Sequence, residues 1–426
     1  MSYLHPLSST LSIAAAAERP WDVGILGAGV AGASLALRLA RKGLEVLLLE
    51  AQRFPREKVC GGCLNLRALE VIEELGLLSA CKLAGGVPID SFHIRYGRRD
   101  VHWKIPPMLS IRRSTLDTLL VQEAIAAGAH FLDRAYATIP PYTTLPPAQR
   151  DSSTGLQIQV RRQGDDESPS GNFAQASAEI RARCAVVASG LTRSPLSERK
   201  EWPAEIDTRG RIGIQQLISA NVLEHHRWCW SSELCLESPS NLRMLIGREG
   251  YLGISRTDGE YFDFAAAIHP GALRRRSGIS AVIDELLASC DLPGIASIAP
   301  GPWASTPYLT RRSLLVATNR TFLLGDSLGY IEPFTGEGMS WGLTGARELA
   351  TILPAALRSS AFNEPCLMEN AEMMWNRWAR QQQSKQRSIC RWVSRQVRHP
   401  VRTTWLLTGL DYLPAIRNML LKKATQ

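Results

Sequence analysis

The chain has 426 residues, of which 45% are hydrophobic and 21% are charged, and its formal net charge is +9. A chain of this length can bury a large core and is expected to form two packed units, whereas its composition excludes a disordered or fibrous protein. The nearest candidate for a membrane-spanning helix is Trp405 to Leu421. It contains Asp411, Pro414 and Arg417, so a spanning helix is not expected there.

The positive charge is concentrated at one end of the chain. From Arg377 to the C-terminus there are eleven Lys and Arg residues and one acid, Asp411, which is a net +10. The first twenty residues have no basic segment and only a short apolar stretch, Leu11 to Ala17, so they are expected to form a flexible tail and not a signal peptide. The nine cysteines, an odd number, favour free thiols in a reducing cytoplasm.

The N-terminal region predicts a strand–helix–strand unit. An apolar run at Asp22 to Leu26 is followed by helical periodicity over Ala33 to Lys42 and by a second apolar run, Glu45 to Leu49. About thirty residues of this kind suffice for a parallel strand pair. Further helices are expected at Leu66 to Leu75 and at Thr115 to Ala127.

Alternating apolar residues predict two antiparallel regions. Phe92 to Tyr96 and Val101 to Ile105 form one hairpin, and residues 213–268 contain another, in which Asp258-Gly259 is the turn. Residues 138–178 are expected to be an exposed excursion around one strand. The remaining expected elements are strands at Ala185 to Ala188 and Thr321 to Leu324, and helices from Met339 onward, interrupted at Pro354, Pro400 and Pro414.

These elements predict a mixed α/β fold with a Rossmann-like nucleotide-binding domain and an inserted antiparallel substrate sheet. The nucleotide-binding domain is expected in three pieces, residues 21–88, 108–205 and 305–352. The substrate sheet is expected from residues 89–107 and 206–304. Residues 1–20 form the tail, and 353–426 form a basic helical C-terminal region.

A glycine motif follows the first strand and opens the first helix. Gly27, Gly29 and Gly32 match the dinucleotide-binding pattern, which also includes Ala28, Val30 and Ala31. The first glycine permits a tight turn, the second lets a pyrophosphate approach the backbone, and the third allows close packing of helix on strand. Glu50 closes the next strand and is placed to bind a ribose. This motif alone does not distinguish NAD from FAD.

A second segment favours FAD. The apolar strand Phe322 to Leu324 ends on Gly325-Asp326, and a loop then leads to a helix rich in small residues. An aspartate at this place can hold the hydroxyls of a polyol, and the start of the following helix can face a ring that gains negative charge on reduction. The expected cofactor contacts here are Gly325, Asp326, Gly336, Gly338 and Met339. An ordinary strand and turn is the alternative.

The chain resembles the flavoprotein superfamily of p-hydroxybenzoate hydroxylase and geranylgeranyl reductase. The resemblance rests on the glycine motif with Glu50, on Arg113 before Thr115-Leu116-Asp117, on Ala188-Ser189-Gly190, and on Gly325-Asp326 with Pro333 to Gly338. It implies extended FAD, with Asp326 near the ribityl chain and Arg113 near the cofactor. Hydroxylases of this superfamily usually have Asp-Gly at Ser189-Gly190, and this departure argues against a hydroxylase.

The segment Arg56 to Asn65 is expected to turn toward the flavin. Gly61 and Gly62 allow close approach to a flat ring, and Arg56 and Lys58 could offset phosphate or reduced-flavin charge. A flexible surface turn is the alternative. The stretch is similar to the Cys-Gly-Gly segment of geranylgeranyl reductases, which lies beside the isoalloxazine. No catalytic residue is assigned, and Cys60 is the best candidate near the flavin.

Cys60 and Cys63 also form a C-x-x-C pair, so dithiol exchange with flavin is a second reading of this segment. A metal site is not expected, because no other suitably spaced Cys or His residues complete it. The substrate region is rich in aromatic residues, which fill a core or line an apolar cleft. They are Trp228, Trp230, Tyr251, Tyr261, Phe262 and Phe264. Ser231 and Ser232 replace the Ile-Pro of flavin halogenases, which disfavours halogenation.

The basic tail, Arg391 to Lys423, mixes apolar and cationic residues. It suits an amphipathic segment on an anionic membrane surface, or equally a helical cap with a solvated basic face. The protein is therefore expected in the cytoplasm, with a peripheral membrane surface as a partner in the first case. No nucleic-acid-binding module is present. The sequence does not predict an oligomeric state.

The sequence thus predicts an FAD-dependent oxidoreductase that acts on a hydrophobic small molecule. The favoured reaction is a geranylgeranyl-reductase-like reduction of a carbon–carbon double bond by reduced flavin. One alternative is a monooxygenase that hydroxylates an aromatic or polyketide substrate. Another is a non-catalytic lipid escort, comparable to Rab GDP-dissociation inhibitors. Only one nucleotide motif is present, so NADPH would bind transiently or a partner protein would supply the electrons.

Overall fold

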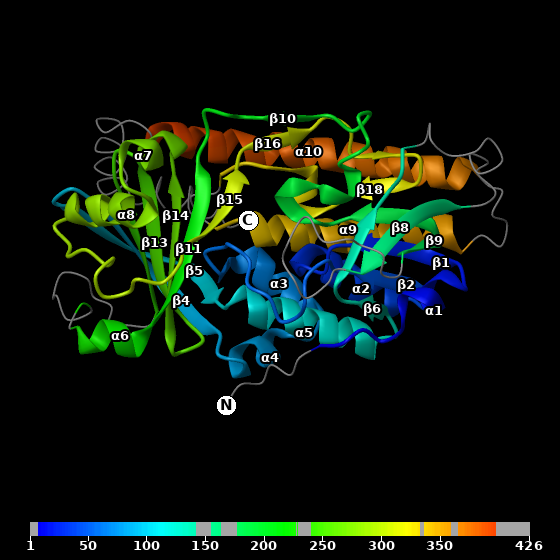
Figure 1. Cartoon of the computed structure of the whole chain (residues 1–426), viewed down its shortest axis with the longest axis horizontal. Coiled ribbons are helices and arrows are strands. Elements are labelled where there is room, and N and C mark those ends of the chain that lie inside the picture. Colours follow the sequence, from blue (N-terminus) through cyan, green and yellow to red (C-terminus); the bar gives the residue numbers. More distant parts are fainter. Residues whose placement is uncertain are drawn as a thin grey trace.

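The computed structural model describes residues 7–141, 155–162, 177–226, 228, 240–332, 336–358 and 365–397. Two large sheets lie side by side along the long axis of the molecule (Figure 1). A parallel sheet with helices around it forms one end, and a mainly antiparallel sheet forms the other. The expected α/β architecture is confirmed.

The first sheet carries the glycine motif. Its strands are β1 (Trp21–Leu26), β2 (Val46–Leu49), β6 (His130–Leu132), β7 (Ala135–Thr138), β8 (Leu156–Arg162), β9 (Ser177–Val187), β17 (Ala317–Thr318) and β18 (Thr321–Leu323). Strands β18, β9, β1, β2 and β6 are parallel neighbours in that order, and β8 runs antiparallel between β7 and β9. β2 is buried along its whole length, as expected for a strand covered by helices on both faces.

Five helices surround this sheet or extend from it toward the second one: α2 (Val30–Ala40), α3 (Leu66–Glu74), α4 (Leu78–Leu83), α5 (Arg113–Ala126) and α9 (Gly338–Leu357). Helix α2 packs on both α5 and α9. Helices α2 and α9 approach closely at Gly342, since a Cβ atom added there would lie only 3.2 Å from Cβ of Ala31. Small residues therefore bring the N-terminal ends of α2 and α9 together.

The second sheet is assembled from three separate parts of the chain. Its order is β15 (Ala304–Tyr308), β11 (Ile212–Ser219), β14 (Tyr261–Ile268), β13 (Gly250–Thr257), β12 (Asn241–Ile246), β4 (Val87–Tyr96), β5 (Arg99–Ser110) and β3 (Cys63–Leu64). The two expected hairpins are β4–β5 and β13–β14. Strand β3 was not expected. It pairs Cys63 with Ser110 and so ties the segment Arg56 to Asn65, called the cysteine–glycine segment below, to this sheet.

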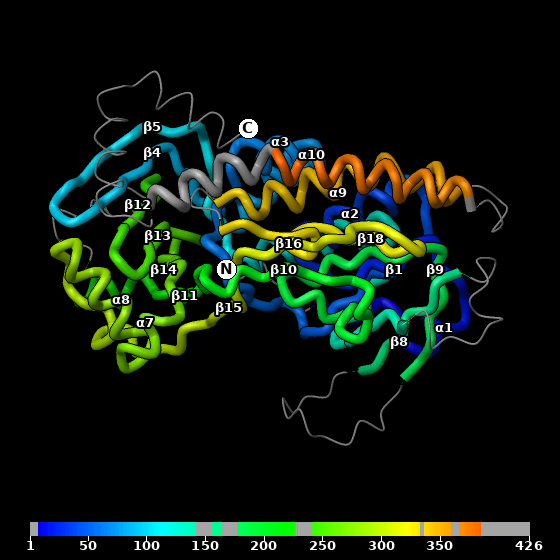
Figure 2. Tube along the Cα trace, turned by 90° about the horizontal axis from the view of Figure 1, so that it is seen from above, coloured from blue at the N-terminus to red at the C-terminus, as the bar shows by residue number. Residues whose placement is uncertain are grey.

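Smaller elements connect the two ends. A short sheet contains β10 (Ala204–Ile206), β16 (Arg311–Ser313) and β19 (Gly329–Tyr330). Helices α6 (Ala220–His225), α7 (Pro270–Arg275) and α8 (Ile279–Ala288) accompany the second sheet, and α10 (Pro365–Val397) runs beside α9 along the molecule (Figure 2). Three 3₁₀ turns, Gly190–Thr192, Ser194–Leu196 and Gly325–Leu328, lie at the junction.

The N-terminal segment differs from the flexible tail that was expected for residues 1–20. Residues 7–20 are ordered against the core, and they include the short helix α1 (Ile13–Ala17). Ser9 Oγ donates to Asp133 Oδ1 at 2.6 Å, and the Thr10 amide donates to the Phe131 carbonyl at 2.8 Å. Ala16 is fully buried. The apolar stretch Leu11 to Ala17, too short for a signal peptide, is long enough to cover the sheet.

Two further expectations change. The one strand expected within residues 138–178 is confirmed as β8, but it lies inside the first sheet with Ile158 and Val160 buried, so this part is not an exposed excursion. Pro354 lies within α9 and does not interrupt it. The expected breaks at Pro400 and Pro414 and the segment Trp405 to Leu421 lie outside the described residues, as do the side chains of the basic tail. The domain boundaries given above stay a prediction.

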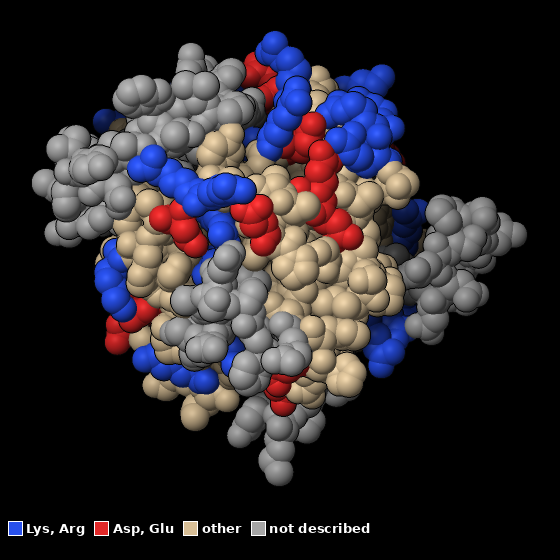
Figure 3. All heavy atoms as spheres, turned by 90° about the vertical axis from the view of Figure 1, so that its left-hand side faces the viewer, with Lys and Arg blue, Asp and Glu red and all other residues tan. Residues whose placement is uncertain are grey.

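In the described part of the chain, no helix has the combination of length and apolar character that a bilayer span requires. The end of the molecule formed by the second sheet carries basic and acidic side chains interspersed over its described surface (Figure 3). Basic and acidic side chains also form ion pairs near α7 and α8, where Arg275 contacts Glu249 and Arg276 contacts Glu285.

Helix α10 is expected to hold the first sheet through Trp375. Its ring is fully buried and stacks on Trp378 with 4.7 Å between centroids, and its indole N–H donates to the Leu323 carbonyl at 3.0 Å. Trp375→Ala should lower the free energy of unfolding by about 3–5 kcal/mol, because it leaves a cavity and an unpaired carbonyl. Urea denaturation measures this loss. Met373→Ala on the same helix, where the side chain is 62% exposed, should change it by less than about 0.5 kcal/mol. Equal losses in the two variants would contradict the assignment.

Candidate functional site

The glycine motif sits where β1, α2 and β9 meet. Gly27 has φ of +114°, and a Cβ atom there would lie 2.5 Å from the Ala188 carbonyl oxygen. A Cβ atom on Gly32 would lie 1.9 Å from the Gly27 carbonyl oxygen. No side chain fits at either place, so the loop is pressed against the end of β9. The first N–H groups of α2, from Val30 on, are left at the cavity, as a phosphate requires.

Glu50 follows β2 at the edge of the cavity, where a ribose was expected. Its carboxylate accepts hydrogen bonds from the backbone N–H groups of Ala28 at 3.0 Å and Gln52 at 3.1 Å. Arg56 lies 3.1 Å from the same carboxylate. These contacts fix the direction of the Glu50 side chain, which is only 8% exposed but lines the cavity.

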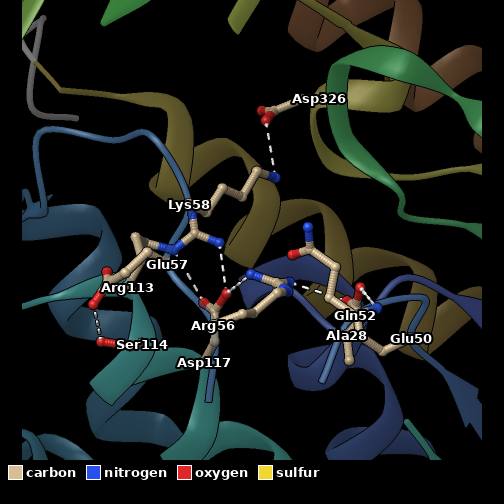
Figure 4. Close-up of polar contacts among 10 residues, drawn as sticks. All are labelled: Ala28, Glu50, Gln52, Arg56, Glu57, Lys58, Arg113, Ser114, Asp117 and Asp326. Atoms are coloured by element: carbon tan, nitrogen blue, oxygen red, sulfur yellow. Dashed lines mark hydrogen bonds and ion pairs between the residues drawn. The ribbon is translucent and has the colours of Figure 1, made fainter. Parts of the chain in front are cut away.

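Two arginines converge on one buried carboxylate beside the glycine motif (Figure 4). Arg56 donates to Asp117 at 3.0 Å, and Arg113 makes a two-point contact with it at 3.0 and 2.8 Å. Burial opposes the charge of Arg113, but Asp117 outweighs that effect and the pKa of Arg113 is raised. A Cβ atom on Gly29 would lie 3.4 and 3.5 Å from the two guanidinium groups. Both positive charges therefore face the loop that would hold a pyrophosphate.

The cysteine–glycine segment crosses from this charged cluster to the second sheet. The Ile111 amide donates to the Gly62 carbonyl at 2.9 Å. The side-chain amide of Gln215, on β11, bonds both backbone groups of Cys60: it accepts from the Cys60 N–H at 3.2 Å and donates to the Cys60 carbonyl at 2.7 Å. The segment is thus held in place and is not a free surface turn.

Asp263, on β14, is a third buried carboxyl group of the site, after Glu50 and Asp117. Gln215 Nε2 lies 2.9 Å from both carboxyl oxygens of Asp263. Asp263 lines the cavity and is only 3% exposed. Burial raises the pKa of Asp263 to about 7, and the Gln215 hydrogen bond only partly opposes this. Sequence reasoning missed this residue. The available signal was an acid between two aromatic residues, Phe262 and Phe264, inside a strand.

Lys58 and Asp326 face each other across the cavity, with 3.8 Å between Nζ and Oδ2 (Figure 4). Lys58 is partly exposed toward the cavity, and removal from bulk water lowers its pKa although Asp326 opposes that effect. A Cβ atom on Gly190 would lie 2.9 Å from Lys58 Nζ. The carboxylate expected near a ribityl chain and the lysine from the Arg56–Asn65 segment therefore share one place.

One cavity of about 670 Å³, a size typical of ligand sites, joins these groups. It is lined by sixteen of the eighteen residues expected to bind the cofactor, all except Ala28 and Gly32. Those sixteen are Gly27, Gly29, Val30, Ala31, Glu50, Arg56, Lys58, Cys60, Gly61, Gly62, Arg113, Gly325, Asp326, Gly336, Gly338 and Met339. The structure places them together; their binding of cofactor stays a prediction.

The residues present fit a dinucleotide flavin. The glycine motif, Cys60, Gly325 and Met339 all line the one cavity, and Gly325 lies beside Ala31 of the motif. Ser189 lines the cavity wall, and its buried hydroxyl has no hydrogen-bond partner among the residues that the structure describes. A bound polar group would satisfy that hydroxyl. The volume of the cavity, the glycine backbone without side chains and the two arginines, Arg56 and Arg113, all suit the phosphates and the polyol.

Comparison with known proteins identifies the domain. Residues 20–188 match the family model described as an FAD binding domain. The chain is 24% identical to Conditioned medium factor receptor 1 of Dictyostelium discoideum over 82% of this chain, and the match spans 65% of that receptor, just under two thirds of its length. It is 26% identical to Menaquinone reductase of Mycobacterium tuberculosis (78% of this chain, 76% of that one) and 26% identical to Kynurenine 3-monooxygenase of Xanthomonas oryzae pv. oryzae (91% and 88%).

The same fold occurs in a solved structure, pqsL, described as a probable FAD-dependent monooxygenase from Pseudomonas aeruginosa. The TM-score is 0.67 at 16% identity, and the match covers 92% of this chain and all of that one. The protein is an FAD-dependent oxidoreductase. Residues 20–188 are similar to an FAD binding domain and the chain resembles FAD-dependent monooxygenase-like proteins, which identifies FAD as its cofactor.

Of the two roles that the sequence left open for the aromatic residues of the substrate region, core and cavity lining, both occur. Trp228, Phe262 and Phe264 belong to the buried core, whereas Tyr251 lines the cavity. Trp230, Ser231 and Ser232 lie outside the described residues. Cys63 is buried, and burial raises the pKa of its thiol to about 12. A thiol so far from ionising is a poor partner for dithiol exchange, which weakens that reading of Cys60 and Cys63.

Asp117→Asn tests the charged cluster. It should lower the free energy of unfolding by about 3–5 kcal/mol and weaken FAD binding, because two buried guanidinium groups lose their counter-charge. Urea denaturation and a flavin-fluorescence titration measure the two effects. Glu74 is a matched control, since it also joins two arginines, Arg38 at 3.0 Å and Arg347 at 2.7 Å, but is 42% exposed. Glu74→Gln should cost less than about 1 kcal/mol and leave FAD binding unchanged. Similar losses in both variants would refute the role of burial.

Asp263→Asn tests the raised pKa. The folded protein holds this proton more tightly than the unfolded chain, whose value is 3.8, so the stabilisation is complete below about pH 4 and is lost as the pH rises through about 7. The wild type should therefore lose unfolding free energy relative to Asp263→Asn between about pH 5 and about pH 8. Parallel urea denaturations at the two pH values measure the difference. A difference that does not change with pH would show that the carboxyl titrates normally.

Proposed function

We propose that this protein is a monooxygenase that uses FAD to hydroxylate a hydrophobic small molecule. The observation that supports the substrate class is the wall of the cavity beyond the cysteine–glycine segment. Its apolar residues come from the second sheet and from the residue that follows β15: Leu242, Met244, Tyr251, Ala265, Ala266, Ala267, Pro307 and Leu309. Polar side chains of the same sheet also line the cavity, namely Gln215, Ser255, Asp263, Ser305 and Thr306, so a mainly apolar molecule with a few polar groups fits best.

The matches favour hydroxylation over the geranylgeranyl-reductase-like reaction. Kynurenine 3-monooxygenase matches along nearly the whole chain, and its name states an oxygen-inserting reaction. Bound FAD supplies hydride acceptance and, with dioxygen, oxygen transfer. The protein's part is to orient the substrate against the cofactor and to exclude water. The apolar wall does the second, and the fixed Cys60–Gly62 segment limits where a flat ring can lie.

Reduction of a carbon–carbon double bond is the second candidate. It is supported by Ser189, which stands where hydroxylases of this superfamily usually have an aspartate, and by the cysteine–glycine segment. A match to Menaquinone reductase over most of the chain also supports it. In either case the electrons are expected from NADPH, bound transiently, or from a partner protein. A peripheral membrane surface remains a proposed partner of the basic C-terminal region.

The purified protein should first be examined by its visible spectrum under anaerobic conditions. Bleaching of bound flavin by NADPH identifies the donor, and an unchanged spectrum indicates a protein donor or substrate-gated reduction. Panels of apolar aromatic compounds and of isoprenoid quinones are then supplied with isotopically labelled dioxygen. Hydroxylation predicts labelled oxygen in the product and consumption of dioxygen. A product that gains two hydrogens without dioxygen would replace the first proposal by the second. Protein that never binds FAD would overturn both.

A further inference from the structure

Gln215 is the link between the buried acid of the second sheet and the segment beside the flavin site. It comes from β11, and its amide reaches the backbone of Cys60 on one side and Asp263 of β14 on the other. Gln215 is itself buried, at 8% exposure. Gln215 therefore connects the two parts of the cavity through the hydrogen bonds of an uncharged side chain.

Both N–H groups of this amide are used, and its oxygen accepts one hydrogen bond. One N–H of Gln215 Nε2 serves the Cys60 carbonyl and the other serves Asp263, while Oε1 accepts from the Cys60 N–H. A carboxylate can only accept, so an ionised Asp263 requires the Nε2 side of the amide to face it. That orientation is also the one that bonds both backbone groups of Cys60.

A neutral Asp263 does not impose this orientation. Its hydroxyl can donate, so the amide could turn and present Oε1 to it, which would break both bonds to Cys60. Even without a turn, the hydrogen bond to a neutral acid is weaker than one to a carboxylate. Burial raises the pKa of Asp263, and the charged or titratable groups that act on it are Glu57, which raises it further, and Arg112, which lowers it. The Cys63 thiol, on β3, also faces Asp263.

We propose that Asp263 is a positioning residue whose ionised form, acting through Gln215, locks the Cys60–Gly62 segment at the cavity wall. Protonation of Asp263 releases the lock. The geometry at Gly62 makes this consequential, because a Cβ atom there would lie 3.0 Å from the Ile111 carbonyl oxygen and 3.4 Å from Asp263 Oδ2. Asp263 therefore lies beside Gly62 and also acts on Cys60 through Gln215, so release of the amide changes what constrains the backbone that the flavin ring would face. The inference rests on the FAD site and not on which reaction it performs.

Amide hydrogen exchange of Cys60 tests the lock directly, since its N–H is the donor to Gln215. The FAD-loaded protein is measured without substrate by mass spectrometry with residue-level fragmentation, and rates are corrected for the intrinsic effect of pH. In the wild type, protection of the Cys60 amide should fall about fivefold between about pH 8 and about pH 6. Asp263→Asn should show the low-pH value at both.

Two further variants complete the test. Gln215→Met has a similar length but no hydrogen bonds, and it should expose the Cys60 amide equally at both pH values. Glu372→Gln removes another partly buried acid with a raised pKa, one that accepts from the Arg320 amide on the far sheet. It should leave the wild-type pH profile of Cys60 unchanged. Should Asp263→Asn fail to fold, the wild-type and Gln215→Met profiles decide.

Protection of Cys60 that is independent of pH in the wild type would overturn the proposal. So would a pH profile retained in Gln215→Met. Because no turnover is measured, a protein that proved to be a reductase, or that was inactive with every compound tried, would leave this result intact. Conversely, a confirmed hydroxylase without the pH profile would refute the lock alone.

Discussion

The site depends on the absence of side chains where the first helix meets the first sheet. Gly27 and Gly32 let the start of α2 touch the end of β9, with no room for a Cβ atom at either residue. This close approach sets the direction of α2, and α2 in turn receives α9 at Ala31 and Gly342. The helix ends and backbone N–H groups at the cavity follow from that packing, because a helix displaced by one side chain would point its first turn elsewhere.

Two buried aspartates then divide the cavity by charge. Asp117 is paired with two guanidinium groups, so it remains compatible with burial and keeps positive charge beside the phosphate loop. Asp263 has only a neutral amide as its direct partner, and burial raises its pKa into the range of ordinary working pH. An aspartate side chain is therefore a fixed counter-ion at one end of the cavity and a titrating group at the other end. Environment, and not residue type, decides which.

The cysteine–glycine segment is held in place at both of its ends. Its charged residues, Arg56 and Lys58, contact the cofactor side, while Cys63 pairs with Ser110 at the edge of the second sheet. A short loop fixed to two sheets can hold a flat ring between them, and the apolar wall behind it can hold an apolar substrate. This arrangement is what the proposed hydroxylation, or the alternative reduction, requires of the protein.

The sequence by itself determined the parallel sheet, the glycine motif, Glu50 and the Gly325-Asp326 turn, because each depends on local periodicity or on backbone freedom within a few residues. It also predicted, from its glycines and charges and through resemblance, that Arg56 to Cys63 turn toward the flavin, and these residues line the same cavity as the glycine motif. It could not identify Gln215 and Asp263 as partners, nor β3 as part of the second sheet, nor the N-terminal residues 7–20 as part of the core. Those features bring together segments that are at least 45 residues apart, because the nearest pair, Leu64 and Leu109, is separated by 109 − 64 = 45 residues. Only the tertiary structure decides which strands become neighbours, and a carboxyl group's pKa follows from those neighbours and not from its own stretch of chain.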